Sequence, residues 1–87
     1  MKIQKSFVKR EVAGEFILVP VGKTTLDLNG LLTLNEVGAF LWDRLPDAEN
    51  EAALVDAVLA EYEAERTAVE QDVSEFLDSL RKLNILD

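Results

Sequence analysis

The sequence predicts an α+β fold, with strands in the first third of the chain and helices in the rest. Residues Phe7 to Val12 and Glu15 to Val21 are rich in β-branched and aromatic side chains and flank a turn at Ala13-Gly14. Past residue 50, apolar side chains recur with the three- and four-residue spacing of helices. Between these regions, the apolar stretch Leu31 to Leu34 runs directly into Asn35, a residue type that caps helices.

The first two strands are expected to form a hairpin, because Gly14 can take the positive φ that a tight turn requires. Pro20 cannot donate a ladder hydrogen bond, so we expect it near the end of its strand. The next segment, Thr24 to Leu28, is interpreted as a short extra strand or an ordered loop. It is joined to the following apolar stretch by Asn29-Gly30, a dipeptide typical of two-residue hairpin turns.

A first helix is predicted over about Glu36 to Leu45. It should end before Pro46, because the residue ahead of a proline is pushed away from helical geometry. Gly38 and Ala39 are small where longer side chains are usual. Two interpretations stay open for them: a close approach of the helix backbone to the sheet, or simple tolerance of glycine within a helix.

Two further helices complete the pattern. One runs from about Glu51 to Glu63, with Asn50 as its cap and a one-sided apolar face. The other opens at Thr67, with Glu70 three residues later as in a capping box. Its apolar stripe is wider than a core face requires and contains Val69, Val73, Phe76, Leu77, Leu80 and Leu83.

The composition indicates a single small globular domain. Apolar residues make up 48% and charged residues 30% of the 87 residues, a balance typical of folded chains. No uncharged apolar run approaches the roughly 18 residues of a membrane span, and the start of the chain lacks a signal-peptide pattern. We therefore expect a cytoplasmic protein with no membrane partner.

The charge and the residue types present exclude several functions. The net charge of −8 repels phosphate backbones, which disfavours nucleic acid as a partner. The chain has no cysteine and no histidine, which removes thiolate chemistry, the usual zinc sites and imidazole catalysis. We expect no enzyme activity, no metal and no cofactor.

The Asp78-Ser79-Leu80 triplet is shared with acyl carrier proteins. Carriers, however, are all-helical and present their serine at the start of a mid-chain helix, whereas this triplet lies inside the last predicted helix, so acyl carriage is disfavoured.

What remains is a binding module with a candidate surface. If Leu31 to Leu34 forms an edge strand, its outward N–H and C=O groups can pair with an extended peptide. This strand carries no protective charge, and the last helix has apolar residues to spare. Strand and helix would then form the two walls of an apolar groove. The alternative is that the domain's own helices cover the strand entirely, and the sequence pattern leaves both readings open.

The order of these pieces resembles that of the PqqD-like family, also called RiPP recognition elements. The resemblance spans nearly the whole chain and rests on the Val-Pro strand end, on Leu-Asn followed by Gly-Ala and Leu-Trp, and on the closing Phe-Leu-x-x-Leu helix. It implies a winged-helix-like domain in which an N-terminal three-stranded antiparallel sheet precedes three helices. It also implies that the leader segment of a ribosomally made precursor peptide is captured as a strand added to the third strand.

Carried onto this sequence, the resemblance implies a peptide-binding site with two walls. The strand wall would consist of Leu31, Leu32, Thr33 and Leu34, and the helix wall would draw on Asp72, Val73, Phe76 and Leu80. We expect Val69, Leu77 and Leu83 mainly to support the fold.

The resemblance also implies a partner, a radical SAM maturase with a SPASM-type extension. The runner-up function is a general protein-interaction or regulatory module without a precursor peptide. An exposed apolar edge would also permit a homodimer.

Overall fold

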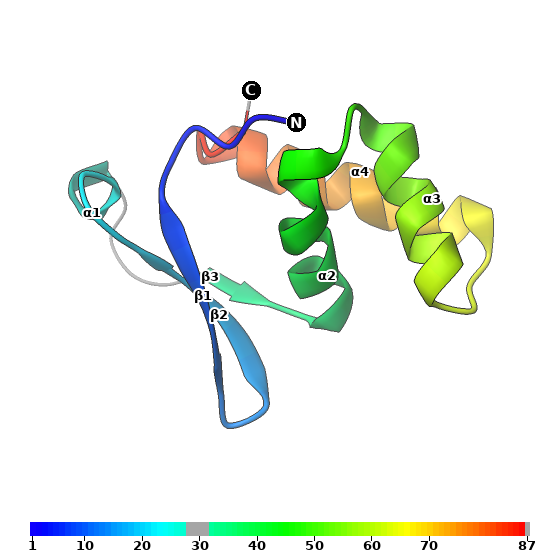
Figure 1. Ribbon diagram of the computed structural model, residues 1–87, viewed down its shortest axis with the longest axis horizontal. Helices are drawn as coiled ribbons and strands as arrows, with labels where there is room; N and C mark the ends of the chain where they lie inside the picture. The colour runs from blue at the N-terminus through cyan, green and yellow to red at the C-terminus, as the bar shows by residue number, and fades with distance from the viewer. Residues whose placement is uncertain (28–31, 87) are drawn as a thin grey trace.

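The computed structural model of the protein describes residues 1–27 and 32–86. A three-stranded antiparallel sheet lies on one side, and three longer helices pack together on the other (Figure 1). This confirms the predicted α+β fold of a sheet followed by three helices. In chain order the elements are β1 (Phe7–Val12), β2 (Glu15–Pro20), α1 (Thr24–Asp27), β3 (Leu32–Leu34), α2 (Glu36–Arg44), the 3-10 helix η1 (Leu45–Asp47), α3 (Glu51–Glu61) and α4 (Arg66–Lys82).

The strands lie in the order β1-β2-β3, and the predicted hairpin between β1 and β2 is confirmed. Its turn residues Ala13 and Gly14 have φ values of 52° and 81°. Positive φ at both positions is what a type I′ turn requires. In the register, Leu18 of β2 lies opposite Leu32 of β3, and Leu18 is fully buried against the helices.

Residues Thr24–Asp27 form a single helical turn, so the expected strand or loop at Thr24 to Leu28 was wrong. The chain leaves β2 through Gly22, whose φ of 59° is incompatible with a continuing strand. The Thr25 hydroxyl donates to the Gly22 carbonyl, and the Thr24 hydroxyl accepts from the backbone N–H of Ser6. These side chains satisfy the backbone locally, in place of a ladder. The predicted Asn29-Gly30 turn lies outside the described residues.

Helix α2 begins where β3 ends, and Asn35 caps it as predicted. The Asn35 side chain accepts a hydrogen bond from the backbone N–H of Gly38 over 2.7 Å. A Cβ atom at Gly38 would lie 3.2 Å from Asn35 Oδ1 and 3.5 Å from Leu34 Cβ. The tight contact is with the helix's own cap residue, and the contact with Leu34 at the end of β3 is an ordinary van der Waals one, so both interpretations of Gly38 stay open. The helix ends at Arg44, ahead of Pro46.

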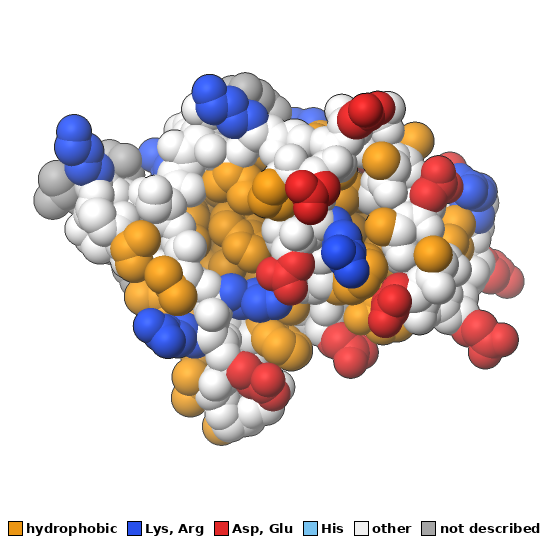
Figure 2. Space-filling model, viewed as in Figure 1, with side chains coloured by type: hydrophobic (Ala, Val, Ile, Leu, Met, Phe, Trp, Pro, Cys, Tyr) orange, Lys and Arg blue, Asp and Glu red, His pale blue; other side chains and the backbone are white. Residues whose placement is uncertain are grey.

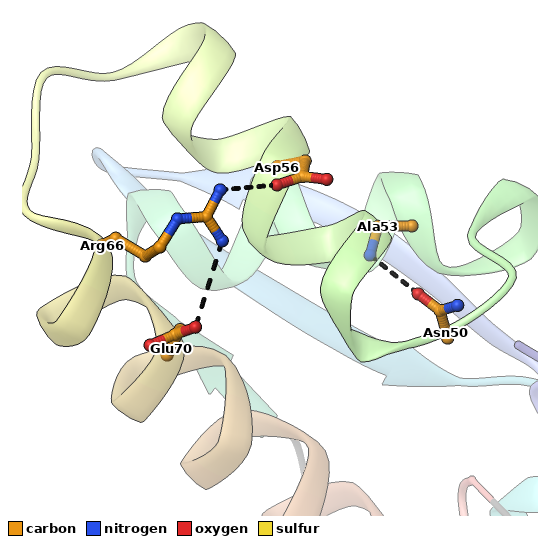
Figure 3. Close-up of polar contacts among 5 residues, drawn as sticks. All are labelled: Asn50, Ala53, Asp56, Arg66 and Glu70. Atoms are coloured by element: carbon orange, nitrogen blue, oxygen red, sulfur yellow. Dashed lines mark hydrogen bonds and ion pairs between the residues drawn. The ribbon is translucent and has the colours of Figure 1, made fainter.

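Polar contacts lie at the starts of α3 and α4 (Figure 3). Asn50 caps α3 as predicted, its side chain accepting from the N–H of Ala53 over 2.9 Å. Helix α4 begins at Arg66, after an N-cap residue that makes no side-chain cap hydrogen bond, so the predicted capping box at Thr67 was wrong. Instead, Arg66 reaches Asp56 of α3 at 2.9 Å and Glu70 at 3.9 Å. These ion pairs are exposed and contribute little stability, so burial of the apolar stripe of α4 decides where the helix lies.

The core lies between the sheet and the three long helices. An edge-to-face contact between Phe7 of β1 and Trp42 of α2, at 5.6 Å between ring centroids, joins the two layers. The two ends of the chain meet, because the N–H of Gln4 donates to the carbonyl of Ile85 over 2.6 Å. The largest side chains with essentially no exposed surface are Leu18, Leu41, Leu45, Leu54, Leu77, Ile85 and Val73.

The charges divide between the two layers. On the face shown in Figure 2, acidic side chains gather over α3 and the start of α4, and several Lys or Arg side chains lie over the sheet and α1. Among the described residues, no helix is both long and apolar enough to cross a bilayer.

The hairpin turn generates a first prediction. Alanine with positive φ is strained by roughly 1 kcal/mol, whereas asparagine tolerates this conformation and Asn-Gly is the preferred type I′ pair. Ala13→Asn should therefore raise the free energy of unfolding by about 0.5–1 kcal/mol. Urea unfolding followed by circular dichroism measures the change. The matched control is Ala13→Val, which should destabilise because a β-branched side chain opposes positive φ. Equal stabilities for the two variants would contradict the turn geometry.

Candidate functional site

Strand β3 is an edge of the sheet. It pairs with β2 and, within the described residues, with no other strand, so one side of its backbone is free to form a ladder. Leu32 and Leu34 are half-buried and share the face that looks toward the helices, whereas Thr33 between them is exposed. Of the four predicted strand-wall residues, Leu31 lies outside the described residues. The other three form β3.

A groove runs between β3 and α4. Its first hollow, of about 220 Å³, is bounded on one side by the strand and on the other by apolar side chains of α4 and of the residue after it. It is mostly apolar, and its lining residues are Leu32, Thr33, Leu34, Asn35, Gly38, Phe76, Ser79, Leu80 and Leu83. Of the strand residues that the structure describes, Leu32 and Leu34 are half-buried and Thr33 is exposed, so the domain's own helices do not cover these three entirely.

A second hollow continues the groove along α4 toward the start of that helix. It measures about 280 Å³ and shares Asn35, Gly38, Phe76 and Ser79 with the first. Two carboxylates, Asp72 and Glu75, line it in addition to Val37 and Leu41. None of the described residues that line the two hollows is a lysine or an arginine. The groove therefore changes from apolar at the Leu83 end to acidic at the Asp72 end.

Three of the four predicted helix-wall residues line the groove. Phe76 is half-buried and borders both hollows, Asp72 lies at the acidic end, and Leu80 lines the apolar end although only 3% of its surface is exposed. Val73 lines neither of these two hollows and has no exposed surface, but it is one of the residues that line a third hollow beyond Asp72. Leu83, which we expected mainly to support the fold, is half-buried and lines the apolar hollow.

Gly38 and Ser79 were missed as site residues by the sequence analysis. Gly38 is buried where α2 approaches β3, and because it lacks a side chain it leaves both hollows open. Ser79 lies one turn from Phe76 on α4, and its hydroxyl donates to the Glu75 carbonyl over 3.0 Å. The position of Gly38 could have been predicted from the sequence, because Gly38 is a small residue directly after a strand-to-helix junction.

A third hollow, of about 210 Å³, begins beyond Asp72, between α2, α3 and α4. Val37 and Asp72 line both this hollow and the second one. Tyr62 also lines it, with its ring held edge-on by Phe40 at 5.5 Å between centroids. Partial burial, reinforced by the negative charges of Glu36 and Glu61, raises the pKa of the Tyr62 hydroxyl above its ordinary value.

The described part of the chain holds no group of three or more histidine, cysteine, aspartate or glutamate side chains that could bind a metal ion. The groove offers instead an unpaired strand edge, apolar side chains and two carboxylates. These are the elements that bind an extended, partly apolar chain.

Comparison with known families agrees with this geometry. The family model described as "Coenzyme PQQ synthesis protein D (PqqD)" matches residues 15–86. The chain belongs to the PqqD family. No curated protein sequence matches it significantly. The matched region of this PqqD-family chain includes β2, β3 and all of the helices that form the groove.

Two solved structures resemble this PqqD-family chain. One, described as "TbiB1 in Complex with the TbiA(beta) Leader Peptide", is 29% identical, has a TM-score of 0.73, and the match covers 100% of this chain and 95% of that one. The other, described as "Lasso peptide synthetase B1 complexed with the leader peptide", is 22% identical, with a TM-score of 0.68 and coverage of 93% and 89%. Because the second structure is only 22% identical, its similarity shows a shared fold and nothing more.

The groove generates a second prediction, which separates its wall from the core. Phe76 and Leu77 are neighbours on α4, but Phe76 borders the groove and Leu77 is fully buried. Leu77→Ala should lower the free energy of unfolding by about 3–4 kcal/mol, because it leaves a cavity. Phe76→Ala should cost only about 1–2 kcal/mol, because its ring already adjoins open space. Urea unfolding of both variants tests this, and a larger loss for Phe76→Ala would place Phe76 in the core.

Proposed function

We propose that this protein is a RiPP recognition element, a non-catalytic module that captures the leader segment of a ribosomally synthesised precursor peptide and presents it to a tailoring enzyme. One observation carries the proposal: an unpaired strand edge, β3, forms one wall of a groove whose other wall is α4. The 29% identical structure, of nearly the same length, is in complex with a leader peptide, which supports a peptide as the occupant.

The proposed complex follows from the chemistry of the two walls. An extended peptide adds to β3 as an antiparallel strand and gains backbone hydrogen bonds that do not depend on its sequence. Alternate peptide side chains then point toward α4, where Phe76, Leu80 and Leu83 offer apolar contacts. The backbone hydrogen bonds hold the peptide extended along β3, and the side chains that enter the hollows supply register and selectivity.

The chemistry of the groove suits holding a peptide, not modifying one. The hydroxyls at hand are those of Thr33 and Ser79, and the Ser79 hydroxyl is engaged by the backbone carbonyl of Glu75. A nucleophile needs an adjacent base to activate it, and the hydrogen bond that the Ser79 hydroxyl donates goes to a backbone carbonyl, not to a carboxylate. We therefore assign the chemical step to a partner.

The partner we propose is a radical SAM maturase with a SPASM-type extension, acting in the cytoplasm. Support comes from the family description, which names coenzyme PQQ synthesis. Co-purification of the tagged protein with a radical SAM protein encoded beside it tests this step separately from peptide binding. Co-purification with a processing enzyme of another class would contradict the proposed radical SAM partner but would leave the proposed binding of a leader peptide standing.

The test of peptide binding is calorimetry against the leader segments of short precursor genes near this gene. A few backbone hydrogen bonds at roughly 1 kcal/mol each, together with two or three buried side chains and less the cost of ordering the peptide, give dissociation constants between micromolar and nanomolar. The heat-capacity change should be negative, because apolar surface is buried. An absence of both heat and amide chemical-shift changes with every such peptide would contradict the proposed function.

A further prediction tests β3 as the docking strand. Thr33→Pro removes a backbone donor and fixes φ in the middle of β3, so peptide affinity should fall by about ten-fold or more. The matched control is Thr33→Val, which keeps the backbone N–H and the shape of the side chain and should bind as the wild type does. Affinities are compared at a temperature where circular dichroism shows all three proteins folded. Unchanged affinity of a folded Thr33→Pro variant would rule out this strand.

A further inference from the structure

The two ends of the groove differ in chemistry, and this difference can orient and select a peptide. At one end Leu32, Leu80 and Leu83 surround an apolar hollow. At the other end Asp72 stands between the second hollow and the third. A peptide that spans the groove therefore meets an apolar surface with one half and a negative surface with the other.

The third hollow has the composition of a pocket for a long basic side chain. Its floor is apolar, with Val37, Val58 and Val69, and two carboxylates, Glu63 and Asp72, stand at its rim. Lysine and arginine side chains pack their methylene stems on such surfaces and keep the charged end at a polar rim. The ring of Tyr62 on the wall adds a face that attracts cations.

The rim carboxylates are not used by the fold. Neither Asp72 nor Glu63 forms a hydrogen bond or an ion pair with any residue in the described ranges. The nearby cations on the helices are engaged elsewhere: Arg66 with Asp56 and Glu70, and Arg44 over the Phe40 ring at 4.9 Å. Glu36 and Glu61 add to the negative potential there, since they help raise the pKa of Tyr62.

The direction of the peptide follows from the direction of the walls. Strand β3 runs from Leu32, beside the Leu83 end of α4, toward Asn35 and the Asp72 end. An antiparallel peptide runs the opposite way, so its N-terminal half lies at Asp72 and its C-terminal half lies at Leu80 and Leu83.

We propose that the leader carries a lysine or arginine N-terminal to its apolar strand segment, and that this side chain enters the third hollow and pairs with Asp72. The inference rests on the proposed function and specifies its substrate class. Asp72 thereby determines both the direction of the peptide and its register on β3, which a three-residue strand alone specifies weakly.

The structure also gives the spacing between the two anchors. Asp72 and Leu80 are separated along α4 by about 12 Å, at 1.5 Å per residue. An extended peptide covers this distance in about four residues. Residues four apart lie on the same face of a strand, so a basic side chain at Asp72 and an apolar side chain at Leu80 can point to the same wall. The recognised pattern is a basic residue followed about four residues later by an apolar one.

The experiment is selection from a displayed library of random peptides on the immobilised protein. We expect wild-type binders to carry Lys or Arg about four residues before Leu, Ile, Val or Phe. The same selection on Asp72→Asn should lose this basic preference and keep the apolar one. The matched control is Asp78→Asn, the same change about 120° away around α4, which should keep both preferences because Asp78 lines none of the three hollows.

The interaction between the basic side chain and Asp72 is then measured with two synthetic peptides: the strongest binder and its Lys→Gln or Arg→Gln variant. The substitution should weaken binding to the wild type about two- to five-fold, less at high salt, and leave binding to Asp72→Asn unchanged.

Binders that need β3, as shown by their loss on Thr33→Pro, but lack the basic residue would overturn this inference and leave leader binding in place. A basic residue enriched on the C-terminal side would overturn it as well. If the wild type retains no peptide at all, the proposed function falls and this inference falls with it.

Discussion

The junction between β3 and α2 is the constraint on which the rest of the structure depends. Asn35 ends the strand and caps the helix, and its side chain holds the N–H of Gly38 at 2.7 Å. Gly38 lies beside Leu34, so the start of α2 is packed against the end of β3. Trp42 of the same helix contacts Phe7 of β1, so α2 also ties the far side of the sheet to the helical layer. The wall of the groove that β3 forms is therefore anchored to the helical layer through α2.

Helix α4 serves the core and the groove with two adjacent stripes. Val69, Val73, Leu77 and Leu80 are buried and form the stripe that holds the helix to the sheet and to α3. Phe76, Ser79 and Leu83 follow one another at three- and four-residue spacing and form the stripe that faces the groove. Leu80 belongs to both. The excess apolar width of this helix in the sequence corresponds to the second stripe, and residues one position apart on α4 have separable contributions to stability and to binding.

Local sequence patterns predicted most of the strands and helices. Tertiary packing determined the turn at α1, the start of α4 and the side of α4 that faces the groove. Asn35 and Asn50 were recognisable as caps because each directly precedes a helical apolar pattern. The first turn of α4 and the helical turn α1 were misjudged, because tertiary contacts override a short capping or β-like pattern there. The family resemblance, not the pattern alone, placed Asp72, Phe76 and Leu80 near the groove. The pattern did not reveal that Leu83 also lines it, because which side of a wide stripe faces the groove depends on the rotation of α4 in the folded core.

The number of outward backbone groups on β3 determines how much of the proposed peptide affinity comes from backbone hydrogen bonds and how much from side chains. A strand of three described residues offers only a few outward hydrogen-bonding groups, and each net bond contributes about 1 kcal/mol. These three residues alone would hold an added strand weakly, whether it came from a peptide or from a second copy. The net charge of −8 further opposes association between copies. Affinity must therefore come mainly from side chains in the hollows along α4, and selectivity among peptides must lie in the shape and charge of that wall.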